Sequence, residues 1–286
     1  MSTIRELLNQ TSIDKVDAKV LLSHLCQTKL GWPKSALISR DTETLPESFV
    51  NQWQDFEIRR ANGEPVAYII GHREFHEIDL LVAPGVLIPR PETELLVDLC
   101  IEHLKTISQG QFPLKLLDLG TGSGAIALAI AHHFKSKGSI NLKVTGLDIS
   151  EDALSIAQKN CSNLDLDEAA TFMQSSWFEA IPTTDSFDVI VSNPPYIAAD
   201  DPHLSQGDLR FEPSQALTDH ANGLSAYQSI IENAPKYLVR GGLLAFEHGY
   251  DQASAIKSLF KEHGFMNVKN IKDYAGLDRI TYGFAS

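Results

Sequence analysis

The chain has 286 residues, and its 37 acidic side chains outnumber its 24 lysines and arginines, which gives a formal net charge of −13. This balance disfavours a general nucleic-acid binder, because phosphate backbones are held by clustered Lys and Arg. Hydrophobic residues make up 43% of the chain and charged residues 21%, which is ordinary for a soluble globular protein. The length fits one large domain or two ordinary ones.

The cysteines Cys26, Cys100 and Cys161 are scattered, so they form neither a disulfide framework nor a zinc motif. The simplest interpretation of these scattered cysteines is that the protein works in a reducing compartment. The first residues lack a basic-then-apolar signal pattern, and no apolar run approaches the roughly 18 residues of a membrane span. We therefore expect a cytoplasmic protein with no membrane partner and no metal.

Residues 1–71 predict a small helical domain. Thr3-Ile-Arg-Glu6 fits a capping box that opens a first helix, and Asp14 can cap a second. Apolar residues at helical spacing mark the second helix and one that follows Pro46: Val16, Val20, Leu21, Leu25, Phe49, Trp53 and Phe56. Gly71 can close one more short helix. The domain has no chemical motif, so we expect it to recognise a substrate.

The pattern changes after this domain. The stretch from Arg73 to Leu87 alternates loosely and breaks at Pro84-Gly85, which predicts a β-hairpin linking two domains over residues 72–90. Arg90 lies between two prolines, and Glu92 begins a helix to about Leu104. Both a helix-starting role and a functional role stay open for Arg90 and Glu92.

Strands and helices then alternate, which predicts a doubly wound, mainly parallel sheet in a catalytic domain over residues 91–286. The expected strands are 114–119, 142–147, 171–173, 187–191, 243–246, 268–271 and 279–284. The expected helices are 124–136, 151–163, 222–238 and 251–263. Only a loop separates the last two strands, so the final strand is expected to be antiparallel. A long polar loop over 197–221 is expected to be a lid or a binding loop.

One strand end carries the sequence Ser192-Asn193-Pro194-Pro195-Tyr196, directly after a buried apolar run. Two consecutive prolines have no backbone N–H and a fixed φ, so this corner is stiff and offers only acceptors. The Asn193 side-chain oxygen and the Pro194 carbonyl, beside the flat face of Tyr196, suit a planar NH2 group. Ligands of open α/β sheets bind beyond the carboxyl ends of strands, which favours function over a simple turn.

A second strand leads into Asp118-Leu-Gly120-Thr121-Gly122-Ser123-Gly124 and then a helix. Glycines let the backbone turn tightly and approach a ligand closely. The spacing departs from the dinucleotide pattern Gly-x-Gly-x-x-Gly, and the motif lacks the lysine of a phosphate-binding P-loop. The loop therefore favours a nucleoside ligand without a pyrophosphate, and a purely structural glycine turn is the alternative.

Two more strand ends carry residues suited to a nucleoside. Asp148 follows a strand and can accept hydrogen bonds from both ribose hydroxyls. Trp177 follows the next strand and can flank an adenine ring, although a core aromatic is the common alternative. A nucleoside beside a corner that grips an NH2 group points to S-adenosyl-L-methionine.

The chain resembles the HemK/PrmC family over nearly its full length, including the helical N-terminal domain. The motifs that carry this resemblance are Arg73-Glu-Phe, Leu87-Ile-Pro-Arg-Pro-Glu-Thr-Glu94, Asp118–Gly124, Ser192-Asn-Pro-Pro-Tyr-Ile197, Asp208-Leu-Arg-Phe-Glu-Pro213 and Gly241-Gly-Leu-Leu-Ala-Phe-Glu-His-Gly249. His76 and Glu77 look less typical of the family.

The resemblance implies a class I methyltransferase with a seven-stranded sheet that methylates N5 of the glutamine in the Gly-Gly-Gln motif of class-1 peptide chain release factors. It implies cofactor contacts at Gly120, Thr121, Gly122, Ser123, Gly124, Asp148, Trp177 and Asn193. It implies substrate contacts at Asn193, Pro194, Pro195 and Tyr196, of which Asn193, Pro194 and Tyr196 are the catalytic candidates. The expected product of the cofactor is S-adenosyl-L-homocysteine.

Two other functions stay open at this point. The same corner can grip a flipped base, so a DNA adenine or cytosine amine methyltransferase is the main alternative. The acidic charge and the lack of a target-recognition segment argue against it. The second alternative is a cofactor-sensing or ribosome-associated binding module that catalyses no reaction.

Overall fold

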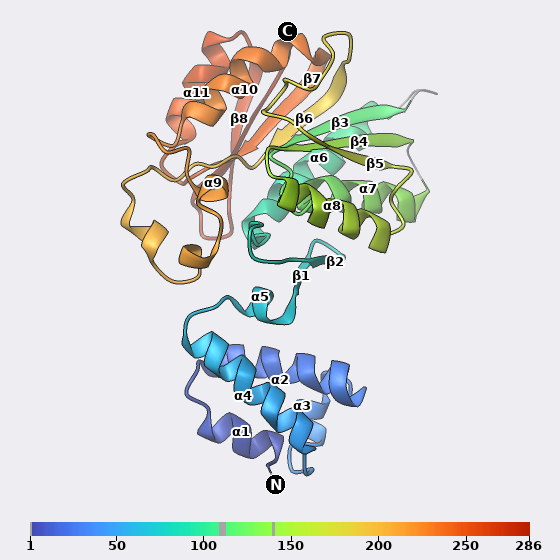
Figure 1. The fold of residues 1–286 in the computed structure, drawn as a ribbon. Coiled ribbons are helices and arrows are strands. Elements are labelled where there is room, and N and C mark those ends of the chain that lie inside the picture. Colours follow the sequence, from blue (N-terminus) through green and yellow to red (C-terminus); the bar gives the residue numbers. More distant parts are fainter. Residues whose placement is uncertain (1, 109–112, 139–140) are drawn as a thin grey trace. The chain divides into compact units, whose positions relative to one another are not determined.

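The computed structural model describes residues 2–108, 113–138 and 141–286, and the chain divides into two compact units, Met1–His72 and Arg73–Ser286 (Figure 1). The first unit has one buried apolar cluster and the second unit has two. Within the described residues, no helix combines the length and the apolar character that a membrane crossing requires.

The first unit is helical. Its helices are α1 (Ile4–Gln10), α2 (Lys15–Leu30), α3 (Ala36–Ser39), α4 (Glu47–Ala61) and α5 (Val66–Ile70). The predicted capping box is confirmed, since the Thr3 hydroxyl accepts from the Glu6 N–H and the Glu6 carboxylate accepts from the Thr3 N–H. Asp14 caps α2 by accepting from the Val16 N–H, and Gly71 ends α5 at a φ of 77°. Local sequence chemistry therefore sets these helix ends.

The apolar residues that marked the helices of this unit are not all buried. Phe49, Trp53 and Phe56 of α4 are buried, as expected. Val16 and Val20, which helped to mark the second helix, are 68% and 43% exposed. At 100° per residue they lie on the side of α2 opposite the residues that are buried: Ala18, Leu21, Leu22, Leu25 and Cys26.

The second unit is built on a seven-stranded sheet with the strand order β5-β4-β3-β6-β7-β9-β8. The strands are β3 (Leu114–Leu119), β4 (Leu142–Asp148), β5 (Ala170–Gln174), β6 (Phe187–Ser192), β7 (Leu238–Glu247), β8 (Met266–Lys272) and β9 (Asp278–Phe284). The first five are parallel in the sheet, and β9 is antiparallel to both β7 and β8. This confirms the doubly wound sheet and the antiparallel final strand.

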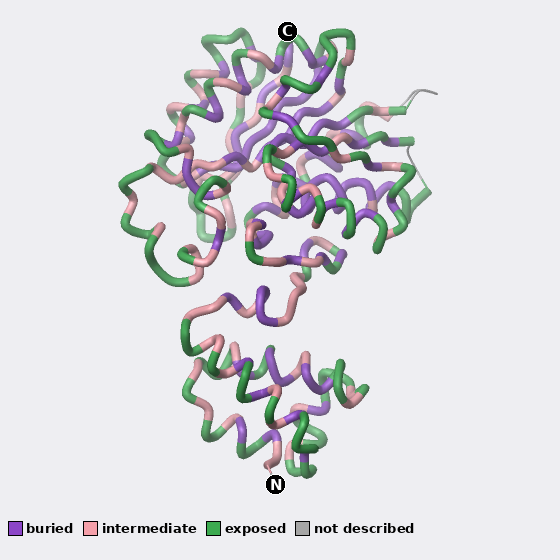
Figure 2. The backbone as a smooth tube through the Cα atoms, viewed as in Figure 1, coloured by how far each residue is buried: buried purple, intermediate pink, exposed green. Residues whose placement is uncertain are grey.

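Helices cover both faces of this sheet (Figure 1). The helices α6 (Glu94–Ile107), α7 (Ala125–Lys137) and α8 (Glu151–Asn163) share one apolar cluster with the sheet, and α10 (Ser225–Asn233) and α11 (Ala253–Glu262) share the other. Alternate residues of a strand face opposite layers: Leu116 belongs to the first cluster and Leu117 to the second. The buried backbone accordingly gathers along the strands in Figure 2.

One predicted strand and one predicted helix of the second unit have other bounds in the structure. The strand β7 begins at Leu238 rather than residue 243, because a register shift absorbs Gly241, whose φ is 77°, and Gly242. The helix expected over 222–238 is α10 followed by a 3₁₀ turn, η4 (Ala234–Lys236), since Pro235 cannot continue the α-helical hydrogen bonds.

The hairpin preceding the sheet is shorter than expected. It comprises β1 (His72–Phe75) and β2 (Ile78–Leu81), and its turn is at His76-Glu77 rather than at Pro84-Gly85. Both turn residues have positive φ, 45° and 63°, which is the type I′ geometry that favours Asn-Gly. Neither turn residue is glycine or asparagine, so the sequence gives no sign of a tight turn here. Phe75, Ile78 and Leu80 pack into the cluster of α6 and α7, so the hairpin is part of the second unit.

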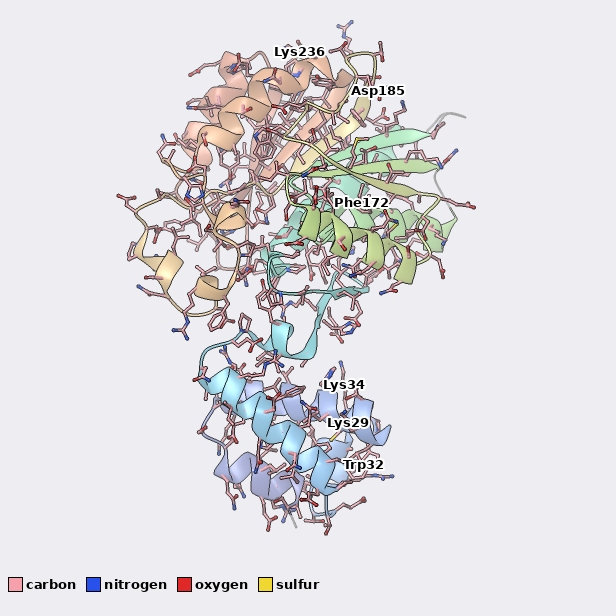
Figure 3. The ribbon with its side chains drawn as sticks, in the orientation of Figure 1. Lys29, Trp32, Lys34, Phe172, Asp185 and Lys236 are labelled. Atoms are coloured by element: carbon pink, nitrogen blue, oxygen red, sulfur yellow. The ribbon has the colours of Figure 1, made fainter. Side chains whose placement is uncertain are left out.

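Close packing also extends to the edge of the sheet. On β4, a Cβ added at Gly146 would lie 2.6 Å from the ring of Phe172 on β5, a side chain labelled in Figure 3. It would also lie 2.9 Å from Thr121 Oγ1 of the glycine loop. A glycine at this strand position lets the loop and Phe172 approach the sheet backbone.

Candidate active site

A pocket opens at the carboxyl ends of β3, β4, β5 and β6, where an open α/β sheet places its ligand. Four separate segments of the second unit line it. They are the stretch before α6 (Gly85, Val86, Leu87, Pro89, Arg90, Thr93), the glycine loop and the start of α7 (Gly120, Thr121, Gly122, Ser123, Ala125, Ile126), the ends of β4 and β5 with the start of α8 (Asp148, Ile149, Ser150, Ala153, Ser175, Trp177), and the stretch after β6 (Asn193, Pro195, Pro213, Gln215, Ala216).

The glycine loop is held in a conformation that side chains disfavour. Gly120, Gly122 and Gly124 have φ values of 68°, 57° and 82°. A Cβ on Gly124 would lie 2.9 Å from Leu128 Cδ1, so this glycine serves the packing of α7 and does not line the pocket. Gly120 and Gly122 present bare backbone to the pocket.

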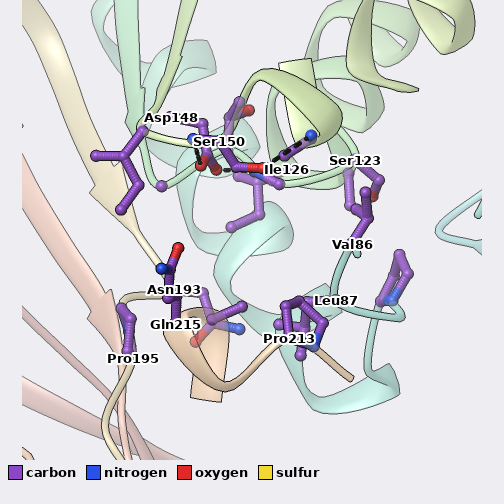
Figure 4. Close-up of a pocket in the computed structure, with 18 of the residues that line it drawn as sticks. Val86, Leu87, Ser123, Ile126, Asp148, Ser150, Asn193, Pro195, Pro213 and Gln215 are labelled. Carbon is purple, nitrogen blue, oxygen red and sulfur yellow. Dashed lines mark hydrogen bonds between the residues drawn. The ribbon is translucent and has the colours of Figure 1, made fainter. Parts of the chain in front are cut away.

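Asp148 joins this loop to the end of β4. Its Oδ2 accepts from the Gly122 N–H at 2.8 Å, and its Oδ1 accepts from the Ser150 N–H at 2.9 Å (Figure 4). Burial raises the pKa of Asp148, and these backbone hydrogen bonds oppose that rise. Each carboxylate oxygen keeps a free lone pair, so Asp148 can still accept from a diol in the pocket.

Asp118 lies beneath the glycine loop and is fully buried. Its Oδ2 accepts from the Thr121 hydroxyl at 2.7 Å and from the Ala127 N–H at 3.3 Å. Burial raises the pKa of Asp118 to about 7, mainly because the charged form loses its hydration. Asp118 therefore ties the loop to the first turn of α7 from below, and it does not line the pocket.

Trp177 forms one wall of the pocket. Its φ of 48° is unusual for a bulky residue, and the Ser175 hydroxyl stabilises the turn by donating to the Trp177 carbonyl at 2.9 Å. A Cβ on Gly120 would lie 3.8 Å from Trp177 Cζ3, so the indole ring lies close to the glycine loop. A flat ring beside exposed backbone suits a planar heterocycle.

Asn193 projects from the opposite side of the pocket, at the end of β6. The strand end is anchored by the Ser192 hydroxyl, which donates to the Leu119 carbonyl at 2.6 Å. The Asn193 amide nitrogen donates to Thr93 Oγ1 at 3.3 Å. In Figure 4 the side-chain oxygen of Asn193 points toward the part of the pocket that Asp148 and Ser150 line.

Tyr196 lies outside the pocket lining, and its hydroxyl donates to Glu247 Oε1 at 3.5 Å. Glu247 is fully buried at the end of β7, and its Oε2 accepts from the Thr93 hydroxyl at 2.5 Å. Burial raises the pKa of Glu247 to about 7 and also raises that of Tyr196. A buried polar cluster therefore lies behind Asn193.

Arg90 connects two walls of the pocket. Its guanidinium pairs with the buried carboxylate of Glu212, which also accepts from the Ile88 N–H at 2.9 Å. Glu212 and Pro213 belong to the long loop after β6, so this pair fixes that loop beside the stretch before α6. The pKa of Glu212 is raised because burial outweighs the opposing charge of Arg90.

The pocket brings together most of the predicted site residues. Those that line it are Gly120, Thr121, Gly122, Ser123, Asp148, Trp177, Asn193 and Pro195. Gly124, Pro194 and Tyr196 do not line it, and Pro194 is buried. The sequence interpretation gave no role to Thr93, Glu247, Glu212 or Gln215. Three of these fall in motifs that carried the resemblance, which was the only available signal.

Solved structures share this fold. The crystal structure of a methyltransferase from Pyrococcus furiosus superposes with a TM-score of 0.52 at 21% identity, covering 81% of this chain and 98% of that one. A 16S rRNA N2 G1207 methyltransferase from T. thermophilus gives a TM-score of 0.53 at 20% identity, covering 75% and 50%. The family model described as "Methyltransferase domain" matches residues 113–277. The second unit is thus a methyltransferase domain of the Rossmann-like class.

The N-terminal unit and the full-length relatives narrow this class. The model described as "PrmC N-terminal domain" matches residues 1–71. The release factor glutamine methyltransferase of Aliivibrio fischeri is 44% identical over 269 residues, 94% of this chain and 89% of the relative. That of Bordetella pertussis is 40% identical over 284 residues, 99% and 100%. The chain belongs to the release factor glutamine methyltransferase family, which confirms the HemK/PrmC resemblance.

Proposed function

We propose that this protein transfers the methyl group of S-adenosyl-L-methionine to the side-chain amide nitrogen of the glutamine in the Gly-Gly-Gln motif of class-1 peptide chain release factors. The observation that carries the proposal is the orientation of Asn193, whose amide oxygen faces the pocket that the glycine loop and Asp148 line. The family name of the relatives supports the same substrate.

The residues present fit the cofactor. Asp148 keeps acceptor capacity for the ribose hydroxyls, since backbone N–H groups occupy only part of its carboxylate. Gly120 and Gly122 leave space where a Cβ would stand, and Trp177 offers a flat wall to the adenine. When bound, S-adenosyl-L-methionine supplies an electrophilic methyl group: the N–C bond forms as the S–C bond breaks, S-adenosyl-L-homocysteine leaves, and the amide nitrogen loses a proton.

An amide nitrogen is a weak nucleophile because its lone pair is delocalised into the carbonyl. Asn193 Oδ1 and the Pro194 carbonyl would each accept one proton of the substrate NH2, which fixes the direction of the nitrogen and increases its electron density. Pro194 and Pro195 keep the backbone of this corner rigid, so the corner loses little conformational freedom when the substrate reacts. Tyr196 and Pro195 would form the adjoining substrate surface.

The N-terminal helical domain, residues 1–71, is proposed to recognise the release factor, since its sequence carries no chemical motif of its own. We propose that the reaction takes place in the cytoplasm. The DNA amine methyltransferase alternative has less support, because the chain carries a charge of −13 and its relatives act by name on release factors.

The test is transfer of radiolabelled methyl groups from S-adenosyl-L-methionine. The substrates are a purified class-1 release factor, the same factor with its Gly-Gly-Gln glutamine replaced by alanine, and double-stranded DNA. Label is expected only on the unmodified factor, with mass spectrometry placing one methyl group on that glutamine. Label on DNA, or equal label on the alanine variant, would overturn the proposal.

A further inference from the structure

Asn193 is one end of a chain of three polar side chains from distant parts of the second unit. Thr93 precedes α6, Asn193 follows β6, and Glu247 ends β7. The Thr93 hydroxyl contacts both neighbours, at 3.3 Å from Asn193 Nδ2 and 2.5 Å from Glu247 Oε2. Thr93 is 4% exposed and Glu247 is 1% exposed, so solvent does not compete for these bonds.

When Glu247 is ionised, its carboxylate sets the direction of both hydrogen bonds in this chain. Ionised Glu247, the form present above its pKa of about 7, has no proton to give, so the single proton of the Thr93 hydroxyl then goes to Glu247. Toward Asn193, Thr93 can then only accept, and only the amide nitrogen of Asn193 can donate to it. The amide oxygen must consequently face the other way, into the pocket. A reversed amide would place two hydrogen-bond donors where a substrate NH2 needs an acceptor.

We propose that Thr93, oriented by Glu247, is a positioning residue that fixes the Asn193 side-chain amide with its oxygen toward the substrate. This proposal rests on the proposed function, because the acceptor matters only for a substrate with an NH2 group. Tyr196 supports the same arrangement, as its hydroxyl donates to the other oxygen of Glu247 at 3.5 Å.

Other groups near Glu247 hold it in place. The Tyr227 hydroxyl donates to the Glu247 backbone carbonyl at 2.9 Å. The charges that act on the Glu247 carboxyl are Arg279 on β9, which favours its ionised form, and Glu92 at the start of the 3₁₀ turn η1 (Pro91–Thr93), which opposes it. Hydrogen bonds from Tyr196 and Tyr227 therefore hold Glu247 in addition to the one from Thr93.

The test compares Thr93→Val, which keeps the shape but removes the hydroxyl, with Thr93→Ser, which keeps the hydroxyl. Thr93→Val is expected to lower kcat on a release factor roughly ten- to a hundred-fold, because the Asn193 amide can rotate. Its Kd for S-adenosyl-L-methionine, measured by calorimetry, is expected to change less than about threefold. Thr93→Ser is expected to restore most of kcat. The matched control is Thr145→Val, the same change on β4 outside the pocket lining.

A second readout needs no substrate. The side-chain NH2 signals of Asn193 in a ¹⁵N NMR spectrum, identified by their loss in Asn193→Ala, are expected to shift in Thr93→Val and to stay in place in Thr145→Val. Unchanged signals would overturn the proposal, as would a Thr93→Val enzyme with wild-type kcat or a Thr93→Ser enzyme as slow as Thr93→Val. A wild-type protein that methylates no release factor, with the NMR shift still present, would instead overturn the proposed function alone.

Discussion

The backbone N–H of Gly122 donates to Asp148 Oδ2 at 2.8 Å, so the carboxylate at the end of β4 and the glycine loop at the end of β3 hold each other in place. The φ of Gly122, 57°, points its N–H at the carboxylate and leaves no side chain over the pocket. The Asp148 carboxylate thus supports the glycine loop and still has lone pairs that can accept hydrogen bonds from a ligand. The cofactor site and the loop conformation are coupled through Asp148.

Replacing Asp148 tests this coupling. Asp148→Ala removes the acceptor for the ribose hydroxyls and for the Gly122 N–H, and hydrogen bonds to charged groups contribute about 1.5–3 kcal/mol. Calorimetry is expected to show S-adenosyl-L-methionine binding weakened roughly 10- to 100-fold. The neighbouring exposed residue gives a control, since Glu151→Ala should bind like the wild type. Unchanged affinity in Asp148→Ala would exclude the assigned cofactor role.

Replacing Asn193 separates catalysis from cofactor binding. Asn193→Ala removes the acceptor that faces the pocket, so kcat on a release factor is expected to fall on the order of 100-fold, as expected for a misplaced reacting group. The affinity for S-adenosyl-L-methionine should fall much less than kcat, because the Asn193 amide oxygen is assigned to the substrate amide. Near-wild-type turnover by this variant would contradict the assignment.

Local signals in the sequence predicted much of this molecule. Prolines, caps and alternating apolar runs identified the helix ends, the parallel strands and the corner at Asn193, since each depends on neighbouring residues. The Gly120–Gly124 loop and Asp148 were identifiable because a ligand is expected at the carboxyl ends of strands.

The rest depends on residues far apart in the chain. Thr93 and Glu247 are separated by 154 positions, and Arg90 and Glu212 by 122, so no local pattern reveals their contacts. The hairpin turn at His76-Glu77 was missed for a different reason, because it adopts a glycine-like conformation without glycine. Distant polar pairs and strained turns are thus the features that required the structure.

Gly223 supports the Asn-Pro-Pro-Tyr corner by close approach. A Cβ on Gly223 would lie 2.3 Å from the Tyr196 carbonyl oxygen and 2.7 Å from Gln252 Nε2, which itself donates to that carbonyl at 2.9 Å. Gly223→Ala is therefore expected to displace Tyr196 and lower kcat at least about tenfold. Enzyme assays at saturating substrate measure this effect.

Gly241 provides the matched control for this substitution. Its φ is also +77°, but no atom lies within 4 Å of an added Cβ. Gly241→Ala carries the backbone strain alone, roughly 1–2 kcal/mol, which chemical denaturation should detect in both variants. Only Gly223→Ala should lose turnover. Equal turnover in the two variants would show that the contact with Tyr196 has no catalytic consequence.

Glu247 makes stability depend on pH in a direction that can be measured. Burial raises its folded-state pKa from an ordinary 4.5 to about 7, so the fold favours the neutral form. Its stabilising contribution is fully present below about pH 4.5 and is lost as the pH rises through 7. The side chain of the Glu247→Gln variant is neutral at every pH, so its contribution to the unfolding free energy does not change over this range. The unfolding free energy of the variant minus that of the wild type should rise by about 3 kcal/mol between pH 4.5 and pH 8.

Denaturant unfolding at several pH values measures this difference. Asp118, whose pKa burial also raises to about 7, titrates in both proteins and cancels in the subtraction. Glu232→Gln, an exposed change on α10, should give a difference that does not vary with pH. A flat difference for Glu247→Gln would mean that Glu247 is ionised in the fold at no net cost. In that case Arg279 and the hydrogen bond from Thr93 would fully offset its burial.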